Sequence, residues 1–210
     1  MPITEIALLH LSSGATIDDA SLRSKLTHAK TVMQNYTGRS FSYLQQVEDP
    51  TYIYIIGEWD SLDQHMNEFI PGADNQALLE SLKDLLSVDW LLHIDAAHAQ
   101  LPLPGADGAK QEAPVYAIGR HWVKDGQKEQ FQQTFETEKH HLQGFLTEGD
   151  LGGGWRIDKE ENKEEWVLMT PWDSVEQHFA FAKTDGFAQY SKITGYIEGA
   201  EIKHARLLDT

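Results

Sequence analysis

The sequence contains no cysteine, few basic residues and no long apolar run. Without cysteine, disulfides, thiolate nucleophiles and cysteine-bound zinc are excluded. Seventeen Lys and Arg stand against 33 Asp and Glu, so the net charge is −16 with the ten His counted as neutral. Because nucleic acids and anionic membranes attract basic surfaces, this charge argues against both as partners.

Membrane insertion and secretion have no signal in the sequence either. The longest apolar runs, such as Ile53–Gly57, are far too short to cross a bilayer. The N-terminus shows no basic segment followed by a long apolar stretch, so no signal peptide is expected. Hydrophobic residues make up 40% of the chain, which is enough for a packed core. We therefore expect a cytoplasmic globular protein.

A seven-residue block occurs twice in the chain. Trp-Asp-Ser-Leu-Asp-Gln-His at 59–65 returns at 172–178 as Trp-Asp-Ser-Val-Glu-Gln-His, with five identities and two conservative exchanges. Each block follows a strand-like run and leads into helix-like sequence. The sequence therefore predicts two copies of one α+β unit.

Both halves predict the same order of elements, β-α-β-β-α-β, which is the ferredoxin-like arrangement. In the first half we expect strands at 5–11, 40–47, 52–58 and 88–94, a helix at 17–36, and a second helix at 61–86 that Pro71 and Gly72 interrupt. In the second half we expect strands at 115–123, 154–158, 165–169 and 201–207, a helix at 127–146, and a broken helix at 174–197.

The expected fold class is α+β, with two tandem ferredoxin-like units at 1–95 and 115–210. Residues 96–114 are rich in Ala, Gly and Pro, which is linker composition. Helices on one face of each sheet leave the other face bare and apolar, so it needs a partner. We expect the units to pack sheet to sheet as a pseudo-dimeric barrel, either as a monomer or within a homodimer.

The segments Glu58-Trp59-Asp60-Ser61 and Pro171-Trp172-Asp173-Ser174 resemble a motif of the dimeric α+β-barrel superfamily, in its antibiotic-biosynthesis-monooxygenase-like branch. There a strand ending in Trp-x-Ser leads into a short helix, a break and a second helix. The superfamily includes cofactor-free oxygenases, polyketide cyclases, haem-degrading enzymes, decarboxylases, isomerases and stress-response proteins, so the resemblance implies the fold far more narrowly than the function. It also implies a pocket between each sheet and its helices.

Glu138 and His141 are the first candidates for catalysis. When the first helices of the two halves are aligned, Glu138 stands opposite Ala29 and His141 opposite Val32. A buried unpaired carboxylate costs several kcal/mol, which makes the exchange notable in a core. A Glu–His pair three residues apart on one helix face can act as acid and base. The alternative is that both side chains reach solvent at the helix edge.

Supporting roles are assigned to residues around this pair. Arg120 or His121 on the facing strand is expected to pair with Glu138, with Arg120 stabilising an oxyanion. His178 is predicted as a further acid or base, although its counterpart His65 favours a structural tie. Arg120, His121, Trp155 and Trp172 are predicted to contact substrate. Trp172 also suits a structural wedge where the strand meets the helix.

No metal or organic cofactor is expected. The adjacent His140 and His141 point about 100° apart on a helix, and no His-x-x-x-His motif occurs. The haem-degrading relatives imply a histidine after the helix break, where neither 76–80 nor 187–191 has one. The predicted function is proton transfer on a small apolar, aromatic or polyketide-like molecule of secondary metabolism, by cyclisation, isomerisation, decarboxylation or oxygenation. The alternative is a non-catalytic binding or stress-response protein.

Overall fold

The computed structural model describes residues 1–104, 113–146, 150–161 and 163–209. The chain folds into two compact units, Met1–His98 with Ala205–Thr210, and Ala99–His204. The boundaries 1–95 and 115–210 remain a prediction from the repeat, since residues 105–112 of the expected linker lie outside the described residues.

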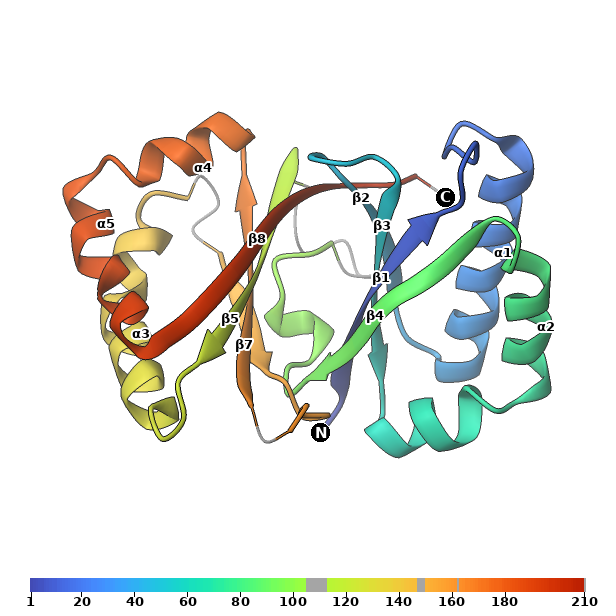
Figure 1. Cartoon of the computed structure of the whole chain (residues 1–210), viewed down its shortest axis with the longest axis horizontal. Coiled ribbons are helices and arrows are strands. Elements are labelled where there is room, and N and C mark those ends of the chain that lie inside the picture. Colours follow the sequence, from blue (N-terminus) through green and yellow to red (C-terminus); the bar gives the residue numbers. More distant parts are fainter. Residues whose placement is uncertain (105–112, 147–149, 162, 210) are drawn as a thin grey trace. The chain divides into compact units, whose positions relative to one another are not determined.

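The first unit is a four-stranded antiparallel sheet with helices on one face (Figure 1). The sheet order is β4-β1-β3-β2, and residues 205–207 of β8 pair with the end of β2. The elements are β1 (Ile3–Leu11), α1 (Ala20–Thr37), β2 (Phe41–Gln46), β3 (Tyr52–Trp59), the π-helix η1 (Gln64–Phe69), α2 (Ala73–Leu82), β4 (Leu86–Ile94) and the 3-10 turn η2 (His98–Gln100).

The second unit has the same kind of sheet, in the order β8-β5-β7-β6, again with helices on one face (Figure 1). Its elements are β5 (Val115–Val123), α3 (Lys128–Gln143), β6 (Gly152–Trp155), β7 (Glu164–Trp172), α4 (Val175–Phe181), α5 (Asp185–Tyr190), the 3-10 helix η3 (Ser191–Tyr196) and β8 (Ile197–Leu207). The predicted α+β class and its eight strands are thereby confirmed, while sheet-to-sheet packing stays a prediction.

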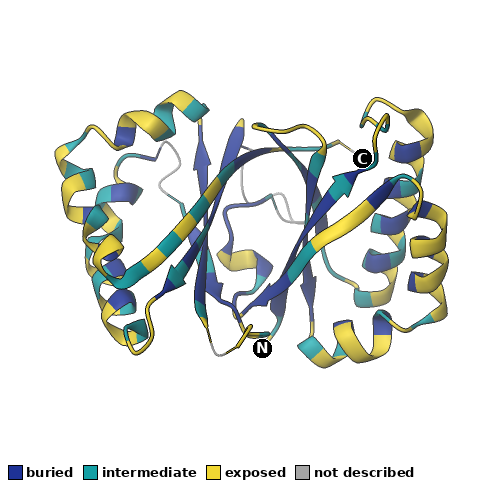
Figure 2. Ribbon diagram, viewed as in Figure 1, coloured by how far each residue is buried: buried dark blue, intermediate teal, exposed yellow. Residues whose placement is uncertain are grey.

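Helix α1 shows how the sequence sets an element that later shapes the site. Asp19 caps it by accepting hydrogen bonds from the backbone N–H groups of Ser21 and Leu22, and Gly38 ends it with φ +69°. Leu26 and its neighbours at three- and four-residue spacing face the sheet and are buried. Figure 2 shows this pattern on the helices of both units, exposed outside and buried towards the strands.

The second predicted helix of the first unit differs from the expected 61–86. Ser61 Oγ accepts from Gln64 N at 3.1 Å, as a cap should, but the following turn is π-helical over Gln64–Phe69. The break at Pro71 and Gly72 is confirmed, and α2 then begins at Ala73. Nowhere in the described ranges does a helix have the length and apolar character required to cross a bilayer.

Candidate functional site

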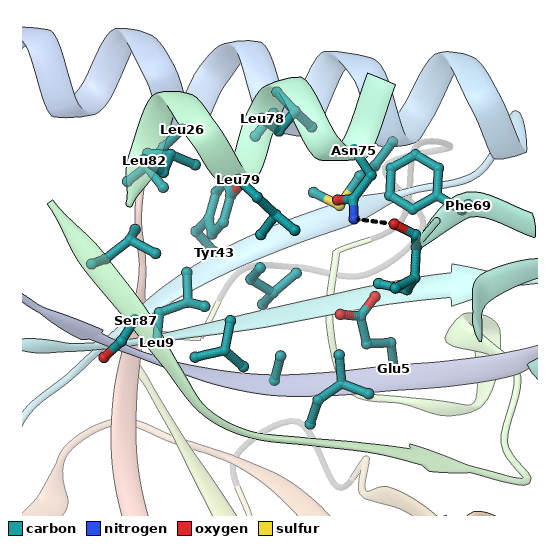
Figure 3. Close-up of a pocket in the computed structure, with 18 of the residues that line it drawn as sticks. Glu5, Leu9, Leu26, Tyr43, Phe69, Asn75, Leu78, Leu79, Leu82 and Ser87 are labelled. Atoms are coloured by element: carbon teal, nitrogen blue, oxygen red, sulfur yellow. Dashed lines mark hydrogen bonds between the residues drawn. The ribbon is translucent and has the colours of Figure 1, made fainter. Parts of the chain in front are cut away.

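A cavity of about 380 Å³ lies inside the first unit, between the sheet and helices α1 and α2 (Figure 3). Volumes of this size hold small molecules in other proteins. Most of the wall is aliphatic or aromatic and comes from Leu9, Leu26, Ala29, Met33, Ile55, Phe69, Leu78, Leu82 and Leu91. Its polar lining comes from the buried residues Glu5, Tyr43, His65 and Asn75, and from Lys83 and Ser87.

Glu5 is the one charged side chain of strand β1 and points from the sheet into this cavity (Figure 3). Its Oε2 accepts a hydrogen bond from Trp59 Nε1 at 2.7 Å. Burial raises the pKa of the Glu5 carboxyl to about 7, although the Trp59 hydrogen bond and the charge of His93 lower it. A carboxyl that titrates near neutral pH suits both acid and base catalysis.

Two histidines, His93 and His65, lie close to Glu5. His93 lies opposite Glu5 in the β1–β4 pairing, and its Nε2 is 2.7 Å from Nδ1 of His65 on η1. His65 Nε2 is 3.7 Å from Glu5 Oε2, and the His65 ring stacks on Trp59 with centroids 4.0 Å apart. Glu5, His65 and His93 are exposed by only 3%, 2% and 0%, so this cluster is shielded from bulk water.

Tyr43 adds a hydrogen-bond donor to the cavity wall. Burial, and secondarily the negative charge of Glu5, raises the pKa of the Tyr43 phenol above its ordinary value. The phenol therefore stays protonated at neutral pH. Asn75 lines the same cavity and donates from Nδ2 to the Ile70 carbonyl at 2.9 Å (Figure 3).

The second unit contains the same histidine cluster. Nδ1 of His178 lies 2.8 Å from Nε2 of His204, and His178 stacks on Trp172 with centroids 4.3 Å apart. The strand register places Ala117 and Thr170 where the first unit has Glu5 and Gly57. Trp172 Nε1 therefore donates to the Thr170 hydroxyl, at 2.8 Å, and the cluster has no carboxylate at this position.

The cavity between sheet and helices is smaller in the second unit. The cavity bounded by Ala117, Thr170, Trp172 and His178 is about 90 Å³, against about 380 Å³ for the cavity of the first unit. Burial, together with the charge of His204, lowers the pKa of His178 to about 4. His178, predicted as an acid or base, is therefore a neutral imidazole at physiological pH.

Glu138 and His141 do lie together on α3, as the sequence predicted. Glu138 Oε1 is 2.7 Å from Lys192 Nζ, and Oε2 is 3.4 Å from His141 Nε2. The Lys192 hydrogen bond, with the charges around it, lowers the pKa of Glu138. The two side chains are 13% and 29% exposed, and neither lines the 90 Å³ cavity. Their catalytic role remains a prediction.

The expected partner of Glu138 is different in the structure. Arg120 binds Glu165 through its Nε and lies over the Trp122 ring, 5.5 Å from the centroid. The predicted pairing of Arg120 or His121 with Glu138 is therefore wrong, because Lys192 occupies that position. An Arg–carboxylate pair between neighbouring strands satisfies both charges locally.

His121 and Trp155 lie in the interior of the second unit. His121 lines the 90 Å³ cavity, its Nδ1 is 3.2 Å from the Trp166 carbonyl, and burial lowers its pKa. Trp155 is buried and donates from Nε1 to Gln132 Oε1 at 2.8 Å. Both side chains thus have packing partners, and their predicted contact with substrate stays a prediction.

Sequence reasoning missed Glu5 and the two partner histidines. The signal for Glu5 was present, since it is one acidic residue in the apolar run Ile3–Leu11. His93 and His204 each stand near the end of the last strand of their unit. Their contact with the histidine of the repeated block depends on which residues meet between a strand and a helix, and no local pattern shows this.

The two cavities between sheet and helices do not fit a haem. The histidine that lines the 380 Å³ cavity, His65, directs Nδ1 to His93 and Nε2 towards Glu5, so neither nitrogen is directed at a ligand in the cavity. The 90 Å³ cavity is far smaller than a porphyrin. In the part of the chain that the structure describes, no group of three or more His, Cys, Asp or Glu is placed to hold a metal ion.

No protein-family model matches the chain, and no curated protein matches it by sequence. Solved structures do share its fold. A candidate monooxygenase of Fusobacterium nucleatum subsp. nucleatum has a TM-score of 0.64 at 11% identity, covering 99% of this chain and 93% of its own. One of Lactobacillus acidophilus has a TM-score of 0.60 at 15% identity, with 99% of both chains covered.

An anthrone oxidase-like protein is also similar, with a TM-score of 0.61 at 10% identity over 99% of this chain and 92% of its own. At these identities the likeness establishes the fold alone. It agrees with the resemblance to the monooxygenase-like α+β barrels at the level of the fold.

Proposed function

We propose that the first unit is an enzyme site that takes a proton from a small apolar, aromatic or polyketide-like molecule, with Glu5 as the base and without metal or organic cofactor. The observation that carries the proposal is the buried Glu5 carboxylate, which lines a mostly apolar 380 Å³ cavity. The reaction that follows proton removal is a cyclisation, isomerisation, decarboxylation or oxygenation.

The surroundings of Glu5 support this chemistry. Burial keeps the carboxyl partly protonated near neutral pH, with a pKa of about 7, so it can both accept and return a proton. The Tyr43 phenol lines the same cavity and supplies a donor for the negative charge that develops on a substrate oxygen. Apolar walls strengthen both interactions because little water competes for them.

Anthrone is the first substrate to test, because one protein of this fold is named for anthrone oxidation. Removal of a ring C–H proton gives an electron-rich anion, and its reaction with dioxygen yields anthraquinone and water. Every atom is then accounted for, and dioxygen is the oxidant. The base must reach only the one acidic carbon of the substrate, which suits a single carboxylate in a dry pocket.

The experiment compares two carboxylates in the full chain. We expect Glu5→Gln to lower kcat about 10²–10⁴-fold, the usual contribution of a general base, with the fold retained by circular dichroism. Glu138→Gln tests the placement of the site in the second unit. Full turnover in the Glu5→Gln protein would refute the proposal, and loss in the Glu138→Gln protein alone would move the site to the second unit.

A binding protein is the second candidate, because most of the cavity wall is aliphatic or aromatic. This candidate predicts that wild-type protein binds aromatic ligands and does not convert them. It further predicts that Glu5→Gln binds at least as tightly, since the buried carboxylate contributes only a desolvation cost. Ligand fluorescence measures the binding, and product formation by the wild-type protein separates the two candidates.

A further inference from the structure

The cluster behind Glu5 connects three elements of the first unit. Glu5 comes from β1, His65 from η1 and His93 from β4, and each side chain is almost fully buried. The successive gaps are 3.7 Å from Glu5 Oε2 to His65 Nε2 and 2.7 Å from His65 Nδ1 to His93 Nε2. The imidazole of His65 therefore joins the carboxylate to a second imidazole through its two ring nitrogens.

We infer that His65 and His93 form a proton relay that takes the substrate-derived proton from Glu5 and restores its carboxylate. The inference rests on the proposed function of Glu5. Glu5 must take two protons from one carbon in each anthrone oxidation, so its carboxylate has to be restored between them. The relay holds the first proton inside the protein, since His93 is itself 0% exposed, and returns it through the same contacts when water forms.

The transfer balances as two proton steps. Protonated Glu5 Oε2 gives its proton to the unprotonated Nε2 of His65, while the Nδ1–H of His65 passes to Nε2 of His93. Glu5 becomes a carboxylate, His65 ends neutral with its proton on Nε2, and His93 becomes an imidazolium. The first gap of 3.7 Å must shorten by about 0.7 Å to reach hydrogen-bond distance.

The groups that face the relay favour proton transfer from Glu5 towards His93. Trp59 from β3 donates to Glu5 and stacks on His65, so it holds both in place. Tyr43 from β2 stays protonated and adds no negative charge. A carboxylate on Glu5 is in turn the group that stabilises the positive charge arriving on His93.

The second unit provides the matched control. His178 and His204 make the same contact, at 2.8 Å, and His178 stacks on Trp172 in the same way. Ala117 stands at the position of Glu5 there, so no carboxyl at this position can pass a proton to His178. A purely structural role predicts equal effects of changing either pair, and a relay predicts an effect on catalysis from the first pair only.

The first test is nitrogen-15 NMR of the histidine rings in the full-length protein, which needs no substrate. We expect His65 to carry its proton on Nδ1 near pH 7. We further expect its Nε2 resonance to shift with the titration of Glu5 and to lose that shift in Glu5→Gln. A proton on His65 Nε2 throughout, or a titration unchanged by Glu5→Gln, would overturn the relay.

The second test uses anthrone turnover by His93→Gln and His204→Gln. The Gln amide can still hydrogen-bond to the neighbouring imidazole but cannot take a proton. We expect His93→Gln to lower kcat about tenfold with KM unchanged, and His204→Gln to retain kcat. Equal kcat in both variants overturns the relay while leaving Glu5 as base. The proposed function itself fails if Glu5→Gln retains full turnover.

Discussion

Both units contain a Trp–His–His cluster, which is Trp59, His65 and His93 in the first and Trp172, His178 and His204 in the second. The indole N–H of the cluster has a different partner in each unit. In the first unit the indole N–H of Trp59 binds the Glu5 carboxylate, and in the second the indole N–H of Trp172 binds the Thr170 hydroxyl. The Nδ1–Nε2 distance between the two imidazoles is 2.7 Å in the first unit and 2.8 Å in the second. The histidine pairs themselves therefore do not distinguish an active site. The comparison leaves the carboxylate at the Trp59 indole as the feature that distinguishes the first cluster, and our proposal assigns the chemistry to it.

The helix–sheet interior differs as well. Leu26 and Ala29 of α1 border the cavity of the first unit. On α3, Phe135 is buried against Trp166 and Tyr190, with ring centroids 5.2 and 6.4 Å apart. With these larger aromatic groups, the cavity between sheet and helices is about 90 Å³ in the second unit, against about 380 Å³ in the first.

The largest expected effect tests the tight packing of the second unit. Phe135→Ala should lower the free energy of unfolding by about 3–5 kcal/mol, because it removes a buried ring from between two others. Leu26→Ala should cost less, about 2 kcal/mol, because Leu26 already borders a cavity. Urea unfolding followed by tryptophan fluorescence measures both. Equal losses would show that the two interiors are packed alike.

A second prediction fills the larger cavity. Ala29→Phe places a ring in the space beside Glu5, so affinity for an aromatic ligand should fall at least about 100-fold, or about 2.7 kcal/mol. Ser24→Phe, at an exposed position of the same helix, is the control and should bind as the wild type does. Isothermal titration calorimetry measures the affinity of both variants for the ligand. Unchanged affinity in Ala29→Phe would place the ligand elsewhere.

The third prediction concerns pH, where the two units should respond in opposite directions. Glu5 has a pKa raised from 4.5 to about 7, so between these values the folded state binds its proton more tightly. Its contribution to stability is present below pH 4.5 and is lost as pH rises through 7, by up to about 3 kcal/mol. Glu5→Gln should remove this loss and become relatively more stable at pH 8.

The ionisation of His178 changes the stability with pH in the opposite direction. Its pKa is lowered from 6.5 to about 4, so the unfolded state binds the proton more tightly between these values. Its contribution is present above pH 6.5 and is lost as pH falls through 4, again by up to about 3 kcal/mol. His178→Gln should therefore lose less stability on acidification than the wild type. Unfolding midpoints from pH 4 to 8 would contradict the comparison if both variants shifted in the same direction.

Much of the fold was predictable from local pattern. Apolar residues at helical spacing located α1 and α3, and the strand at 115–123 was predicted with its observed bounds. The block ending in His65 and His178 located the point where a strand leads into a helix in both units. These features depend on residues close together in the chain, so periodicity and capping residues reveal them.

The candidate site depended on contacts that no local pattern contains. Glu138 was predicted to pair with Arg120 or His121, but η3 places Lys192 beside it. Glu5 was not singled out from the sequence, and β4 and η1 bring two histidines close to it. Composition and spacing established the α+β units and their buried faces. Cross-strand register and side-chain volume, which link residues far apart in the chain, chose the carboxylate that faces a cavity.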